Sequence, residues 1–182
     1  MNNRFLYDSY RDARNVVWKV LTRYNVVDFP VNVSRLAQKL NIDVNEVAYL
    51  PNGLYAVSYS DGKRSYIEFV SSGNVAVDRF TLAHELGHLL LRHKSDSSRK
   101  EYEEEQANIF AARLLAPMII IREHDPSSAA ELSDIFGMSA SSANIRFNRY
   151  LEMKKRNKFL TNSLEKEYYN IYKSGRVKTY SG

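Results

Sequence analysis

Residues 78–92 read Asp-Arg-Phe-Thr-Leu-Ala-His-Glu-Leu-Gly-His-Leu-Leu-Leu-Arg and contain His-Glu-x-x-His at positions 84–88. Asp78 can cap a helix here, because apolar side chains recur along one face of the stretch. These side chains are Leu82, Leu86, Leu89 and Leu90. Residues four apart on a helix are separated by about 40° around the axis and one turn along it. The imidazoles of His84 and His88 are therefore expected on the same side, where both can bind one ion.

The spacing of the two histidines predicts a zinc site, because neutral imidazole is a common ligand of Zn²⁺. Glu85 stands next to His84, so its carboxylate can reach a water on the ion without being a ligand. The ion lowers the pKa of that water to about 7, and Glu85 is expected to take its proton and deliver it to a leaving amine. The alternative is an amphipathic helix with two exposed histidines, but chance produces this motif only roughly 0.006 times in such a chain.

A catalytic zinc needs a third protein ligand and one open position. Metzincins place a histidine six residues after the second histidine of this motif, but Lys94 stands there. His93 is interpreted as the residue that ends the helix, where the helix dipole favours it. The third ligand must therefore come from another segment of the chain.

A second helix, predicted over residues 102–115, offers that ligand in its acidic first turn. The acids are Glu101, Glu103, Glu104 and Glu105. Glu104 shares a helical face with Asn108, and small alanines beside them would let this helix pack closely against the first. We expect Glu104 to be the third ligand, with Glu105 as the main competitor, and Asn108 to hold one of the ligands in place. The alternative is that acids gather here only because a helix N-terminus attracts them.

Together the two helices resemble the ImmA/IrrE family of zinc metallopeptidases. The blocks that carry the resemblance are R-F-T-x-A-H-E-x-G-H over residues 79–88 and E-x-x-A-N-x-F-A-x-x-L-L-x-P over residues 104–117. The likeness extends more loosely from about residue 30 to residue 151. Residues 1–25 and 157–182 are outside it.

The resemblance implies an α+β fold with a small zincin-like metallopeptidase core. In that core a short antiparallel sheet packs against the HExxH helix and the helices that follow it. It also implies that His84, His88 and the Glu matching Glu104 bind Zn²⁺, with Glu85 catalytic. Members of the family cleave, or trigger the loss of, a DNA-binding repressor, often encoded nearby on a mobile element or in a stress-response locus.

The function expected from these observations is a cytoplasmic, zinc-dependent endopeptidase of narrow specificity. Its partner would be a protein substrate, a repressor or antitoxin-like regulator encoded nearby. One alternative is a non-enzymatic transcriptional regulator that keeps the metal as a structural element. A further alternative is a protein-binding module of a toxin–antitoxin or immunity pair.

The chain before the motif predicts two helices and a small sheet. The helices are expected at residues 4–24 and 34–40, the second capped by Asn32 or Ser34. Ile42 and Val44 alternate with polar residues as in a short strand. Two further β-like runs, residues 54–59 and 65–70, flank an Asp-Gly pair that is typical of a hairpin turn. Residues 75–77 form a third short run of the same character.

Four segments are expected along the chain. They are an N-terminal helix (1–27), the metallopeptidase core (28–125), a helix-turn-helix-like helical subdomain (126–156) and a basic tail that is frayed or disordered (157–182). In the third segment a helical hairpin bends at Gly137, and Arg146 and Arg149 of its second helix could contact DNA. The alternatives are an ordinary corner between two helices that completes the core, or a docking site for the substrate protein.

Composition limits the remaining classes of protein. The chain has 182 residues and no cysteine, which excludes disulfides, thiol nucleophiles and cysteine-based metal sites and fits a cytosolic protein. No stretch approaches the ~18 consecutive apolar residues of a membrane span, so no membrane partner is expected. The formal charge of +5 lies in residues 151–182, which carry eight Lys/Arg and three Glu. Overall basicity is therefore weak evidence for a nucleic-acid partner.

Overall fold

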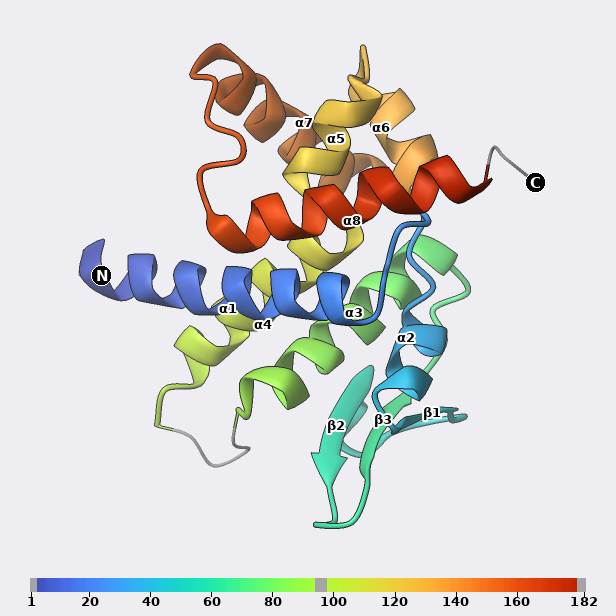
Figure 1. The fold of residues 1–182 in the computed structure, drawn as a ribbon. Coiled ribbons are helices and arrows are strands. Elements are labelled where there is room, and N and C mark those ends of the chain that lie inside the picture. The colour runs from blue at the N-terminus through green and yellow to red at the C-terminus, as the bar shows by residue number, and fades with distance from the viewer. Residues whose placement is uncertain (1–2, 94–97, 180–182) are drawn as a thin grey trace. The chain divides into compact units, whose positions relative to one another are not determined.

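The computed structural model describes residues 3–93 and 98–179 and has the expected α+β architecture (Figure 1). The chain begins with α1 (Asn3–Arg23), α2 (Val33–Lys39) and β1 (Ile42–Glu46), and a 3₁₀ turn (Pro51–Gly53) leads to β2 (Ala56–Ser60) and β3 (Ser65–Phe69). The remaining elements are α3 (Val75–Leu91), α4 (Lys100–Leu115), α5 (Met118–His124), α6 (Ala129–Phe136), α7 (Ala140–Lys155) and α8 (Ser163–Thr179).

Two compact units make up the chain. The first combines Met1–Val16 with Asn32–Ala112, and the second combines Val17–Val31 with Arg113–Gly182. The sheet, α2, α3 and most of α4 lie in the first unit, and α5 to α8 lie in the second. The four segments expected from the sequence remain a prediction.

The sheet of the first unit is mixed, with strand order β1-β3-β2. β2 and β3 form the expected antiparallel hairpin, in which Ser58 is opposite the buried Ile67. The expectation of a wholly antiparallel sheet was wrong for β1, which runs parallel to β3. After β1 the chain enters β2 at the far edge and returns as β3 between the two, so β3 takes the direction of β1. Helix α3 packs against β2 and β3, and α2 packs against β1.

Helix α3 begins one turn earlier than expected. The side chain of Asn74 caps it by accepting hydrogen bonds from the backbone N–H groups of Ala76 and Val77. Residues 75–77 are therefore the first turn of a helix, and their interpretation as a β-like run was wrong. Asp78, the expected cap, instead accepts hydrogen bonds from the hydroxyl and backbone N–H of Ser72. A short β-branched run cannot be told from the start of a helix by pattern alone.

The second unit contains two helices that the sequence pattern did not predict. Pro117 ends α4 as expected, but it is also the N-cap of α5, whose first four residues are buried. The expected frayed tail is α8 over much of its length. Tyr168 and Tyr172 of α8 are buried, and the hydroxyl of Tyr168 donates to the carbonyl of Val26 over 2.8 Å. Tyr168 also stacks on Trp18, with 5.6 Å between the ring centroids.

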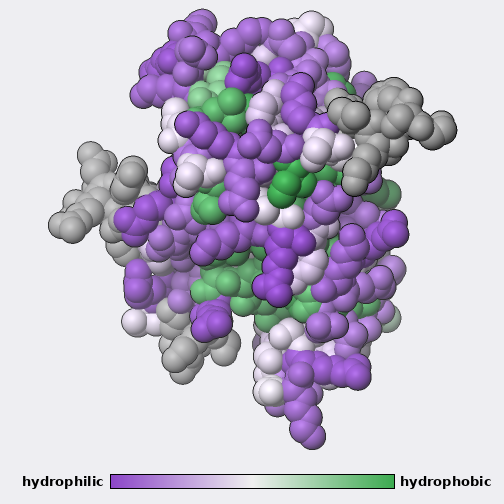
Figure 2. Space-filling model, viewed as in Figure 1, coloured by the Kyte–Doolittle hydropathy of each residue, from purple (hydrophilic) through white to green (hydrophobic). Residues whose placement is uncertain are grey.

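Hydrophilic residues predominate on the face shown in Figure 2, and hydrophobic residues show through in separate patches. In the described part of the chain, none of the helices combines the length and the apolar character that crossing a bilayer requires.

Candidate metal centre

Close packing of α3 against α4 positions the candidate site. Gly87 lies inside the His-Glu-x-x-His motif, and a β-carbon added there would be 3.1 Å from Cδ1 of Phe110 on α4. Phe110, Ala107 and Ala111 are fully buried. The small residues on both helices therefore allow the close approach that the sequence predicted.

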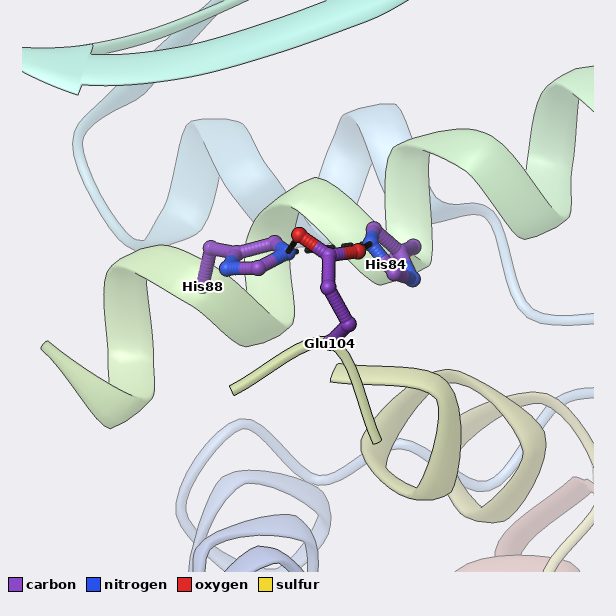
Figure 3. Close-up of side chains that lie close together, drawn as sticks. All are labelled: His84, His88 and Glu104. Atoms are coloured by element: carbon purple, nitrogen blue, oxygen red, sulfur yellow. Dashed lines mark hydrogen bonds and ion pairs between the residues drawn. The ribbon is translucent and has the colours of Figure 1, made fainter. Parts of the chain in front are cut away.

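Three donor groups from these helices meet in the first unit, as Figure 3 shows. Nε2 of His84 lies 2.9 Å from Nε2 of His88. The carboxylate of Glu104 faces both rings, with Oε2 at 3.3 Å from His84 Nε2 and Oε1 at 3.7 Å from His88 Nε2. The donor atoms all lie within 4.8 Å of one another. The structure thus brings together the three residues that the sequence singled out as ligands.

The protonation of the two rings fits a cation at this point. Nδ1 of His84 lies 3.0 Å from Oδ1 of Asn108, which can only accept, so the hydrogen of a neutral His84 is on Nδ1 and Nε2 keeps its lone pair. Burial and the neighbouring His84 lower the pKa of His88 to about 4, so His88 is neutral near pH 7. The two ring nitrogens and the carboxylate that face one another offer three donor atoms to a cation. Nitrogen ligands of a tetrahedral zinc ion are separated by about 3.3 Å, close to the observed spacing.

Glu85, the expected general base, is tied to the sheet by Ser58 of β2. Burial raises the pKa of the Glu85 carboxyl above its usual value, while hydrogen bonds from the hydroxyl and backbone N–H of Ser58 oppose that rise. The neighbouring carboxylate of Glu104 also raises the pKa of Glu85. Ser58 was not singled out in the sequence, because a serine in a strand carries no signal of this contact.

His93 is the second residue whose place the sequence did not reveal. Arg92 adopts a left-handed conformation with φ of 59°, which ends α3 and turns the chain back. His93 consequently lies against His88, with 2.9 Å between their Nδ1 atoms, and its Nε2 lies 3.0 Å from Oε1 of Gln106. Five residues after a histidine is an unremarkable spacing on a continuing helix, so only the turn at Arg92 makes this contact possible.

Other residues considered from the sequence lie elsewhere. Glu105 is exposed and is not part of the donor cluster, whereas Glu104 is. Arg146 is directed inward and donates two hydrogen bonds to the carbonyl of Ala116.

Comparison with known proteins identifies a peptidase family. A model of a peptidase family, described as the IrrE N-terminal-like domain, matches residues 37–148. The match covers both helices of the donor cluster and the whole sheet. No curated protein matches the chain.

Proposed function

The chain belongs to the peptidase family described as the IrrE N-terminal-like domain, and from that premise we propose that it is a zinc-dependent endopeptidase of narrow specificity. The observation that carries the proposal is the cluster of two imidazole nitrogens and one carboxylate from adjacent helices. Two histidines and one glutamate are a ligand set of catalytic zinc sites, which leave a fourth position open. We propose His84, His88 and Glu104 as the zinc ligands.

The residues around the ligands have distinct roles in this proposal. A bound Zn²⁺ would supply a Lewis acid that polarises the scissile carbonyl and acidifies water. The Glu85 carboxylate accepts a proton from the water whose oxygen attacks the carbonyl carbon, and it returns that proton to the nitrogen of the leaving amine as the C–N bond breaks. Ser58 holds this carboxylate by donating to it from β2. Asn108 holds the His84 ring through the 3.0 Å contact with Nδ1.

The edge of the sheet offers a place for the substrate backbone. Among the strands of the described residues, β2 lies at the end of the order β1-β3-β2 and is therefore an edge strand. It also carries Ser58, which contacts the proposed base. An extended peptide that paired with β2 as an added strand would therefore lie beside Glu85.

The substrate class that we propose is a regulator protein, a DNA-binding repressor or antitoxin-like protein encoded nearby. This part of the proposal rests on the resemblance noted in the sequence. The cytoplasmic location expected from the absence of cysteine likewise stays a prediction.

Co-expression with the product of the adjacent gene tests the proposal. Mass spectrometry of the lysate should find fragments of that product with the parent protein and none with Glu85→Gln, while both proteins contain zinc. An equal fragment pattern with the two proteins would show that Glu85 is not the base. A partner that co-purifies intact with the parent would favour the protein-binding module.

The rival function is a transcriptional regulator with a structural metal. The α6–α7 hairpin carries Arg149, which is half exposed and pairs with Glu152 over 3.2 Å. Arg146 does not support this rival, because its guanidinium is bound to Ala116 inside the second unit. A salt-dependent mobility shift on DNA of its own locus, lost in Arg149→Ala and kept in Glu85→Gln, would favour the regulator.

A further inference from the structure

A chain of polar contacts beside the donor cluster ends on His88. Nδ1 of His88 lies 2.9 Å from Nδ1 of His93, and Nε2 of His93 lies 3.0 Å from Oε1 of Gln106. The amide nitrogen of Gln106 donates to the hydroxyl of Tyr102 over 3.3 Å. Gln106 is only 6% exposed, so the contact with His93 is formed away from bulk water. The backbone N–H of His93 also donates to the carbonyl of His88 over 3.0 Å, which fixes the approach of the two rings.

The donor and the acceptor of each contact in this series can be assigned, starting from Gln106. Oε1 of Gln106 can only accept, so Nε2 of His93 carries the hydrogen. A neutral His93 then has its lone pair on Nδ1, which accepts the hydrogen on Nδ1 of His88. With its hydrogen there, His88 keeps the lone pair on Nε2, the atom 2.9 Å from His84 and 3.7 Å from Glu104.

We propose that His93 and Gln106 are positioning residues that select the tautomer of His88 and hold its ring so that Nε2 faces the other two donors. This role rests on the proposed zinc site. Histidines that bind a metal ordinarily donate their second ring nitrogen to a carboxylate, a carbonyl or water. Here the acceptor is another imidazole, which serves only while Gln106 keeps the hydrogen of His93 on Nε2.

The opposite tautomer of His93 would work against the site. Its hydrogen on Nδ1 would point at the hydrogen on Nδ1 of His88. Relief of that clash requires His88 to move its hydrogen to Nε2, where it blocks the lone pair needed for a metal. Zinc binding should therefore depend on whether Gln106 places an oxygen or a nitrogen next to His93, although neither residue is a proposed zinc ligand.

Two pairs of variants separate this role from simple packing. His93→Phe keeps a ring but removes the acceptor, and Gln106→Leu keeps the approximate shape but removes the oxygen. Gln106→Glu keeps an accepting oxygen. The matched control is Gln38→Leu, an exposed position on α2. If Gln106 only fills space, Leu should be tolerated better than Glu, because burial of a charge is costly.

The experiment measures zinc dissociation constants by competition with a chelator, and circular dichroism checks that each variant is folded. Zinc binding should weaken about 10- to 100-fold in His93→Phe and Gln106→Leu and stay near the parent value in Gln106→Glu and Gln38→Leu. Long-range ¹H–¹⁵N spectra of the metal-free parent near pH 7.5 should place the hydrogens on Nδ1 of His88 and Nε2 of His93.

The possible outcomes distinguish this inference from the proposed function. A parent that binds zinc, with His93→Phe and Gln106→Leu binding it equally tightly, overturns the positioning role alone. The positioning role is also overturned if the parent spectra place the hydrogen of His88 on Nε2. These spectra are recorded on the parent protein, so they test the positioning role even if both variants fail to fold. A parent that binds no zinc overturns the proposed function and the positioning role with it.

Discussion

A β-carbon at Gly87 would lie only 3.1 Å from Cδ1 of Phe110, so α3 and α4 are as close as the buried Phe110 ring permits. The carboxylate of Glu104 reaches the histidines of α3 because of this approach, with 3.3 Å between Glu104 Oε2 and His84 Nε2. Gly87 therefore supports the site because it has no side chain that would hold α3 and α4 apart.

Gly87→Val should push the two helices apart. Extra methyl groups in a packed interior cost about 1–3 kcal/mol, so the free energy of unfolding in urea should fall by that amount. Zinc affinity should fall as well, because Glu104 would be displaced from the imidazoles. Ala130→Val, an exposed position on α6, is the control for β-branching in a helix. Parent-like stability and zinc affinity in Gly87→Val would show that the close approach is unnecessary.

Ser58→Ala should slow cleavage without removing zinc. Loss of the hydroxyl that holds the Glu85 carboxylate should lower the cleavage rate about 10-fold, since a hydrogen bond to a charged group contributes about 1.5 kcal/mol. Fragment yield over time is the measurement, with Ser60→Ala on the same strand as the control. Equal cleavage rates for the parent and Ser58→Ala would show that cleavage does not depend on the hydrogen bond from Ser58 to Glu85.

The His-Glu-x-x-His motif could be interpreted from the sequence because its residues lie close together in the chain. Helical spacing is enough to place His84 and His88 on one side, and acids with small residues at the start of the next helix suggested Glu104. The position of His93 depends on the left-handed conformation of Arg92, which no pattern of apolar residues signals.

Elements whose pairing or packing partners are distant in the chain could not be predicted in the same way. The parallel pairing of β1 depends on where the hairpin of β2 and β3 is placed, and five alternating residues do not specify a partner. Helix α8 has a weak pattern of its own, and the buried Tyr168 contacts Trp18 and the carbonyl of Val26, which are distant from it in the chain.

The stability of the second unit should depend on pH through Glu123. Burial raises the pKa of this carboxyl, but hydrogen bonds from Lys173 at 2.5 Å and Tyr169 at 2.6 Å outweigh burial, and the pKa lies below its usual value. The lowered pKa stabilises the folded state above the unfolded value of about 4.3, and this stabilisation is lost as pH falls through the folded pKa.

Glu123→Gln should therefore lower the free energy of unfolding at pH 7 by on the order of 1 kcal/mol. The difference from the parent should close as the pH falls below about 4. Urea unfolding at a series of pH values measures both effects, and Glu167→Gln, an exposed position on α8, is the control. A constant difference at every pH would contradict the assignment to the charge of Glu123.

Arg146→Ala should destabilise the second unit whether or not the protein binds DNA. Burial lowers the pKa of Arg146 to about 10, and its guanidinium donates to the carbonyl of Ala116 over 2.5 and 3.1 Å. The truncated protein should lose about 1–3 kcal/mol of stability. Arg149→Ala, whose partner Glu152 is exposed, should change stability by less than about 0.5 kcal/mol. Equal melting temperatures for Arg146→Ala and the parent would contradict the inward role of Arg146.

Zinc content of the purified protein shows whether the donor cluster of His84, His88 and Glu104 binds the metal. Glu104→Gln and Glu105→Gln are neighbouring, chemically identical changes, of which only the first removes a carboxylate that faces His84 and His88. Elemental analysis should find one zinc per chain in the parent and in Glu105→Gln, and little or none in Glu104→Gln, His84→Ala and His88→Ala. Full zinc content in Glu104→Gln or in either alanine variant would contradict the proposed centre.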